Sequence, residues 1–162
     1  MGGGYIFLGD HTRIYPYSRI ECFNNISGES LTPCLKIGNN VLMGRNTTVL
    51  CAKEIVIEDD VLFASYCFVS DENHGTDLST GQRYEEQKLV CKPVYIGRNC
   101  WIGEKVIILP GVTIGENTII GAGSVVTSSI PPNVIAAGCP ARVVKRYNFV
   151  SKMWERVDKE DK

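Results

Sequence analysis

The side chain best suited to acid–base chemistry is His74, one of two histidines in the chain, in the segment SDENHGTDL at residues 70–78. A neutral imidazole accepts a proton near neutral pH and can thereby activate an alcohol as a nucleophile. Asp71 and Glu72 could orient the ring, or they could equally be solvated loop charges. A single loop histidine is commonly just an exposed side chain, so its role depends on the elements that position it.

A six-residue repeat runs through most of the chain. Apolar residues recur every six positions, many are followed by glycine, and a small or β-branched residue stands four places after each. The clearest series is Ile96, Ile102, Ile108, Ile114, Ile120 and Val126; Ile37, Met43 and Val49, and then Ile57, Phe63 and Val69, fit the same spacing, and Leu8, Ile14, Ile20 and Ile26 fit it more weakly. A period of six matches neither an α-helix nor simple strand alternation.

This repeat predicts an all-β solenoid, a parallel β-helix in which each hexad forms one flat side and three hexads close a triangular coil. The apolar residues would fill the interior. The small residues would fit the tight corners, where glycine also tolerates turn dihedrals. Successive coils would stack about 4.8 Å apart.

Interruptions of the repeat predict loops, which in repeat proteins gather on the binding face. Residues 27–36 delay the next apolar position, and two extra residues fall near 53–56. The longest interruption, a protruding loop at 75–93, begins directly after His74. A loop of this length inside a compact domain is usually functional or disordered.

We expect one β-helical domain over residues 1–142 and a helical tail over 143–162. The tail would form a short C-terminal helix docked on the prism or on a neighbouring chain. Its apolar residues would share one helical face: Phe149, Val150, Met153, Trp154 and Val157.

Composition limits the possible partners and location. The formal net charge of −1 gives no reason to expect nucleic acid or an anionic membrane surface, and no stretch is long enough for a membrane span. The N-terminus lacks the pattern of a signal peptide. Seven cysteines with irregular spacing and no C-x-x-C pair predict free thiols in a reducing cytoplasm, with no zinc or other metal site.

Residues 94–145 contain, in order, NCWIG, PGVTIG, IGAGSVVT and IPPNVIAAGCPARVVK. This ordered series resembles the acetyl-CoA half of the hexapeptide-repeat acetyltransferases, in the sugar and polysaccharide O-acetyltransferase group that includes maltose, galactoside and Nod-factor acetyltransferases. The resemblance implies left-handed coils and a homotrimer with the donor in a groove between two prisms. His74 of one chain would then face donor contacts of another, and a monomer would be inactive.

The segment SDENHG resembles the catalytic segment of the same group, which implies that His74 is the general base in a ternary complex. The resemblance also implies donor contacts from several residues: Trp101 along the pantetheine arm, Gly103 and Glu104 near the thioester, Ala122 through a backbone hydrogen bond, Thr127 near the far end, and Arg142 and Lys145 at the phosphates. Cations suit phosphate because their hydrogen bonds to it are charge-assisted.

The acceptor side is less defined. Asn46, Arg83, Tyr84 and Asp71 are candidate acceptor contacts, and relatives specific for sugars carry asparagine where this chain has Gly44. An N-acetyltransferase acting on an amino sugar or a nucleotide-linked amino sugar would use the same histidine, and a non-catalytic solenoid scaffold is a further alternative. A carbonic anhydrase of this architecture needs three histidine ligands, more than the two in this chain.

Overall fold

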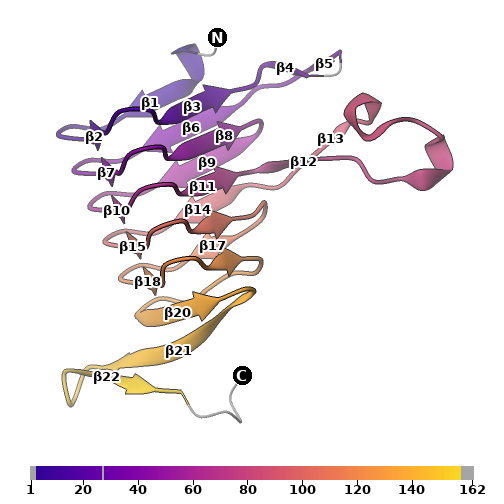
Figure 1. Ribbon diagram of the computed structural model, residues 1–162. Coiled ribbons are helices and arrows are strands. Elements are labelled where there is room, and N and C mark those ends of the chain that lie inside the picture. Colours follow the sequence, from indigo (N-terminus) through magenta and orange to yellow (C-terminus); the bar gives the residue numbers. More distant parts are fainter. Residues whose placement is uncertain (1–2, 27, 158–162) are drawn as a thin grey trace.

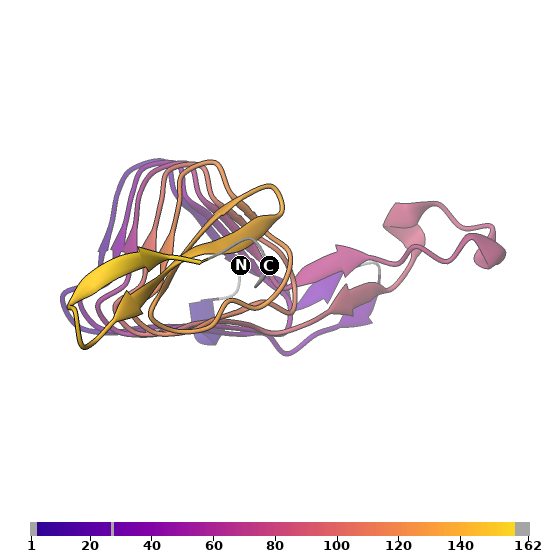
Figure 2. The same cartoon turned by 90° about the horizontal axis from the view of Figure 1, so that it is seen from below.

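A computed structural model describes residues 3–26 and 28–157, and its chain winds into a prism with three flat faces (Figures 1 and 2). Each face is a sheet of parallel strands contributed by successive coils. Face A contains β1 (Ile6–Leu8), β6 (Cys34–Ile37), β9 (Glu54–Ile57), β14 (Val94–Ile96) and β17 (Thr113–Ile114). Face C contains β3 (Arg19–Cys22), β8 (Thr48–Cys51), β11 (Phe68–Ser70), β16 (Ile107–Ile108) and β19 (Val125–Val126).

Face B is the longest sheet because it continues past the last coil. Its parallel part contains β2 (Arg13–Ile14), β7 (Leu42–Met43), β10 (Leu62–Phe63), β15 (Trp101–Ile102), β18 (Ile119–Ile120) and β20 (Val134–Gly138). The strands β21 (Ala141–Asn148) and β22 (Met153–Arg156) then add to it in antiparallel order. One 3-10 turn, η1 (Gly3–Tyr5), precedes the first coil.

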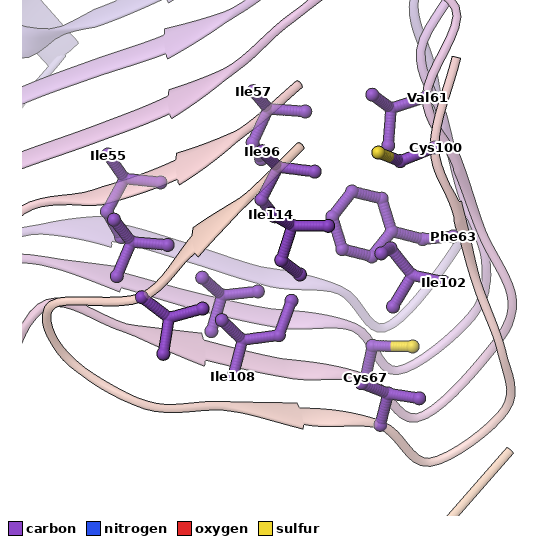
Figure 3. Packing of buried hydrophobic residues seen from close by; sticks show 14 of the residues in the cluster. Ile55, Ile57, Val61, Phe63, Cys67, Ile96, Cys100, Ile102, Ile108 and Ile114 are labelled. Atoms are coloured by element: carbon purple, nitrogen blue, oxygen red, sulfur yellow. The ribbon is translucent and has the colours of Figure 1, made fainter. Parts of the chain in front are cut away.

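The repeating apolar residues form the core, as the six-residue period predicts. From Ile37 to Val126 every residue named above in the repeat is at most 2% exposed. Residues at equivalent positions stack along the prism axis because they are register partners in adjacent coils: Ile57, Ile96 and Ile114 form one such column, and Phe63 lies beside Ile102 (Figure 3).

The glycines that follow the apolar positions serve close contact rather than turn dihedrals. A Cβ on Gly103 would lie 2.7 Å from the backbone nitrogen of Ala122 in the next coil. The residue with left-handed backbone dihedrals is instead the second one after each of these glycines, as at Asn99 (φ 56°), Lys105 (φ 57°) and Asn117 (φ 55°). The expectation that these corner glycines supply the turn dihedrals is therefore wrong.

Two interruptions of the repeat are antiparallel hairpins that leave the prism. The pair β4 (Asn25–Ile26) and β5 (Glu29–Ser30) occupies the first, so Ile26 is not part of the coil. Leu8 and Ile14 do lie in coil strands, as the last residues of β1 and β2, but are 56% and 39% exposed, because the first coil has no neighbour on one side. The second hairpin, the arm (residues 72–91), contains β12 (Glu72–His74), β13 (Leu89–Cys91) and the 3-10 turns η2 (Leu78–Thr80) and η3 (Tyr84–Glu86), and projects far from the prism (Figure 1).

The expected C-terminal helix over 143–162 is wrong for the described part of that range, and residues 158–162 lie outside the described residues. The tail forms the β21–β22 hairpin, because the open edge of β20 offers backbone groups that an added strand can pair. Tyr147 stacks edge-on against Phe149 and Trp154, with ring centroids 5.1 Å apart in both pairs. Within the described residues, no helix is long and apolar enough to cross a membrane.

Candidate active site

His74 is the last residue of β12, where the arm leaves the prism, and it pairs with Leu89 on the returning strand. Its side chain is exposed. No other residue in the described part of the chain makes a hydrogen bond to its ring. The ring nitrogens are therefore available to a substrate.

Two shallow pockets meet at His74. One lies against the prism and is lined by Phe68, Ser70, Glu72, Asn73, His74, Leu109 and Pro110. The other lies along the arm and includes Tyr84 and Val90 with the histidine. The imidazole thus borders a partly apolar floor on face C and a tyrosine from the arm, an arrangement that can hold an acceptor next to a proton-accepting nitrogen. Of the candidate acceptor residues, Tyr84 is brought to His74, and Leu109 and Pro110 are neighbours that the sequence reasoning missed.

Asp71 does not contact the acceptor pocket, so its candidate role there is wrong. Its side chain is fully buried, and its oxygens accept hydrogen bonds from the backbone N–H groups of Ala52, Lys53 and Glu54. The hydrogen bonds of both oxygens are with residues 51–54, and neither oxygen bonds to His74. Glu72, on the same face of β12 as the histidine, borders the pocket without a hydrogen bond to the ring.

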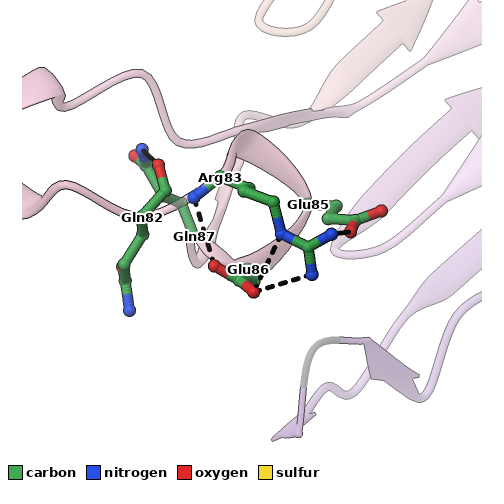
Figure 4. A network of polar contacts seen from close by, with 5 residues as sticks. All are labelled: Gln82, Arg83, Glu85, Glu86 and Gln87. Atoms are coloured by element: carbon green, nitrogen blue, oxygen red, sulfur yellow. Dashed lines mark hydrogen bonds and ion pairs between the residues drawn. The ribbon is translucent and has the colours of Figure 1, made fainter.

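The arm tip is held by its own polar contacts (Figure 4). Gln87 is buried: its Oε1 accepts the Asp77 N–H at 2.9 Å, and its Nε2 donates to the Asp77 carbonyl at 3.1 Å. Arg83 forms ion pairs of 2.8 Å with both Glu85 and Glu86. Because these pairs occupy its guanidinium, Arg83 stabilises the tip locally and is poorly placed for the predicted acceptor contact.

Most of the predicted donor contacts lie on face B and its corner with face C. Trp101 points outward from β15 and is 51% exposed. Gly103 follows it at the corner and stacks directly on Ala122 of the next coil, which is exposed. The Glu104 carboxylate accepts the Ser65 N–H at 3.0 Å and so ties two coils together. Gly103 itself is buried, so a ligand at this corner would meet the indole face and the exposed Ala122.

The remaining donor candidates divide between two sides. Arg142 and Lys145 are on β21, at the C-terminal end of face B, and so continue the side that carries Trp101. Thr127 instead follows β19 on face C, beside Leu109, whose N–H donates to the Val126 carbonyl at 3.1 Å. Thr127 is therefore on the same side of the prism as His74.

A single chain does not bring the histidine and the indole together. His74 borders pockets at the end of face C, whereas Trp101 borders a pocket on face B that contains none of the arm residues. Asn46 is at the corner that precedes β8, away from the arm, with a left-handed φ of 56°. One chain alone thus holds the two halves of the candidate site on different faces.

Sequence reasoning also missed an aromatic pocket beside Trp101. Its wall consists of Tyr147, Phe149 and Trp154 from the C-terminal hairpin, and its floor includes Ile119 and an asparagine ladder, Asn99, Asn117 and Asn133, whose amides are linked at 2.9 and 3.1 Å. The sequence did contain a signal for a strand here. In RYNF, the aromatic residues Tyr147 and Phe149 alternate with polar residues, and alternation with a period of two indicates a strand.

Comparisons with known proteins agree with this geometry. Residues 93–128 match the family described as bacterial transferase hexapeptide (six repeats). The galactoside O-acetyltransferase of Escherichia coli strain K12 is 42% identical over 114 residues, which cover 70% of this chain and 55% of that protein. The chain thus spans little more than half the length of this curated relative.

Solved structures extend the likeness to the whole prism. A galactoside acetyltransferase in complex with coenzyme A superposes with a TM-score of 0.75 and 32% identity, covering 94% of this chain and 72% of the other. A maltose O-acetyltransferase from Clostridium difficile 630 superposes with a TM-score of 0.72 and 33% identity, covering 88% of this chain and 71% of the other. The predicted left-handed parallel β-helix is confirmed.

Proposed function

Because the chain belongs to the hexapeptide-repeat acetyltransferases, we propose that it is an acetyl-CoA-dependent O-acetyltransferase acting on a hydroxyl of a sugar or polysaccharide precursor. The observation that carries the proposal is the exposed His74 imidazole, with no partner among the described residues, at the mouth of a pocket. Relatives named galactoside and maltose O-acetyltransferases support a saccharide acceptor.

The donor supplies an acetyl thioester, and the protein's residues supply the proton transfers and the positioning. His74 accepts the proton of the acceptor hydroxyl as that oxygen attacks the acetyl carbonyl carbon. The histidine then holds the proton that the departing thiolate takes up. No covalent bond to the protein is needed, so the buried cysteines have no part in the reaction.

The donor fits the side of the prism that carries Trp101. The half-exposed indole offers an apolar surface to the pantetheine arm, and the exposed Ala122 at the same corner would offer its backbone to the ligand. Arg142 and Lys145, further along face B, would meet the nucleotide phosphates through charge-assisted hydrogen bonds.

The complete site is proposed to form between chains of a homotrimer. The outward side chains of face B are largely apolar, and Leu62 is 41% exposed beside Trp101. Face C likewise presents Phe68, Ile107 and Val125 in register. If face B of one chain packs against face C of the next, His74 of the second approaches Trp101 of the first, and the two halves of the site meet.

The interface proposal predicts that Ile107→Glu lowers both the oligomeric state and the activity, because a charge would enter an apolar contact. Thr113→Glu on face A is the control, since Thr113 is exposed and outside the proposed interface. Sedimentation velocity and thiol release would be measured on both variants. A trimeric, fully active Ile107→Glu variant would contradict the arrangement.

The proposed activity is tested by incubating the protein with acetyl-CoA and a panel of sugars and amino sugars while thiol release is followed. We expect a sugar hydroxyl acceptor to stimulate release and the product to carry an ester. An amide product would instead show N-acetyl transfer, and failure to bind coenzyme A would favour a scaffold. Since acetyl-CoA is a cytoplasmic metabolite, we place the reaction in the cytoplasm.

A further inference from the structure

The stacking of coils is broken where the arm leaves the prism. On face C, β8 and β11 remain paired up to Leu50 and Ser70. On face A, pairing resumes at Ile55 with Val94. Between these points the backbone N–H groups of Ala52, Lys53 and Glu54 have no strand above them, because the chain has left the prism to form the arm. Backbone donors that are buried or partly buried, as these are, need a partner, and this interruption removes the usual one.

The Asp71 carboxylate takes the place of the missing strand. It accepts the N–H groups of Ala52 at 2.7 Å, Lys53 at 2.8 Å and Glu54 at 2.6 Å, and the Cys51 thiol is 3.6 Å from one oxygen. Successive backbone N–H groups that converge on one anion form a nest, and hydrogen bonds to an ionised carboxylate are stronger than neutral ones. The two extra residues near 53–56 in the sequence belong to this turn.

Backbone hydrogen bonds of Asp71 also connect the arm to the prism at this turn. Its carbonyl accepts the N–H of Lys92, on the returning side, at 2.7 Å. Its own N–H donates to the Leu50 carbonyl at 3.4 Å. One residue therefore connects the outgoing chain, the returning chain and the coil beneath, only three positions before His74.

We infer that Asp71 is a positioning residue: its buried carboxylate fixes the root of the arm and thereby the location of His74 relative to the prism. This inference rests on the proposed role of His74. Asp71 acts through the backbone and not through the imidazole, which distinguishes it from an acidic partner that raises the basicity of a histidine. A misplacement of about 1 Å can lower a rate by roughly 100-fold.

Asp71→Asn tests the inference with little change in size, because it turns one acceptor oxygen into an N–H donor facing the turn. We expect kcat to fall by roughly 10- to 100-fold. The KM for acetyl-CoA should stay near the wild-type value, since the donor residues on face B do not contact Asp71, and the pH profile should keep its shape. Asp59→Asn is the matched control: Asp59 also accepts a backbone N–H, from Asn39 at 2.7 Å, at a corner far from the arm. Its kcat should not change.

Hydrogen exchange measured by mass spectrometry on the intact protein reports whether the Asp71 carboxylate anchors the root of the arm. This measurement does not depend on enzymatic activity. In the wild type the amides of residues 52–54 should exchange as slowly as those of β8 and β9. In Asp71→Asn, exchange should accelerate across residues 72–91, and in Asp59→Asn it should not.

Fast wild-type exchange at residues 52–54 would overturn the inference even if the Asp71 variant failed to fold. Faster exchange in the arm with an unchanged kcat would overturn the positioning role. A wild-type protein without transferase activity, but with the expected exchange pattern, would instead refute the proposed function and leave the anchoring of the arm supported.

Discussion

Substituting alanine for Gly103 tests how closely the coils must approach at the candidate donor corner. The added Cβ would lie 2.7 Å from both the Ala122 nitrogen and the Ile120 carbonyl oxygen, and neither backbone atom can swing aside. The coils would have to separate locally, which weakens the Gly103 N–H bond to the Ile120 oxygen, now 2.9 Å. Overpacking of this kind costs about 1–3 kcal/mol, and the reduced entropy of the unfolded chain returns about 0.4–1 kcal/mol.

We therefore expect Gly103→Ala to lower the free energy of unfolding by about 1–2 kcal/mol. Gly123→Ala is the comparison at the equivalent corner of the next coil. Its φ is +71° and nothing lies within 4 Å of the added Cβ, so it introduces backbone strain without a collision. A left-handed backbone costs an L-residue such as alanine about 1 kcal/mol.

Urea unfolding followed by circular dichroism, at one protein concentration for all variants, measures the difference. Coenzyme A affinity should also fall in Gly103→Ala, because the same separation displaces the corner beside Trp101. If Gly103→Ala unfolds at the wild-type urea midpoint, the reasoning from coil contact is refuted. If it is more stable than Gly123→Ala, collision is not the dominant effect at this corner.

Two further predictions concern ligand binding and thiol chemistry. Trp101→Ala should weaken coenzyme A binding by roughly tenfold in calorimetry, because the pantetheine arm would no longer cover apolar ring surface, which is worth about 25 cal/mol per Å². The melting temperature should change little, because the ring is 51% exposed. Unchanged affinity would remove Trp101 from the donor site. Burial raises the pKa of the Cys67 and Cys100 thiols to about 11, so at pH 8 both stay protonated and unreactive, and a thiol reagent should modify the exposed Cys139 long before either of them. Rapid modification of Cys67 or Cys100 in the native protein, mapped by peptide mass spectrometry, would show that the core is not closed as described.

The prism was predictable because its determinants are local and repeated. Each hexad places its first residue inside, so the spacing of Ile96, Ile102 and Ile108 identifies the core directly, and the confirmed burial follows. The arm was predictable as an interruption of the same spacing. His74 could be singled out because it is the last residue before that interruption.

Features that depend on distant parts of the chain were not predictable. The role of Asp71 requires the N–H groups of residues 52–54, whose lack of a covering strand becomes visible only when the coils are stacked. The tail was misread because Phe149, Met153 and Trp154 suit a helical stripe, whereas the open edge of β20 recruits them into a hairpin. The separation of His74 from Trp101 likewise depends on which face of the prism each strand joins.

The most direct test of the proposed activity is His74→Ala measured in two assays on the same preparation. Thiol release from acetyl-CoA with the best acceptor should fall by at least roughly 100-fold, as expected for loss of a general base. Coenzyme A affinity, measured by calorimetry, should remain at the wild-type value because the histidine does not form the donor side. A variant that binds coenzyme A and retains wild-type turnover would contradict the assignment of His74 as the base.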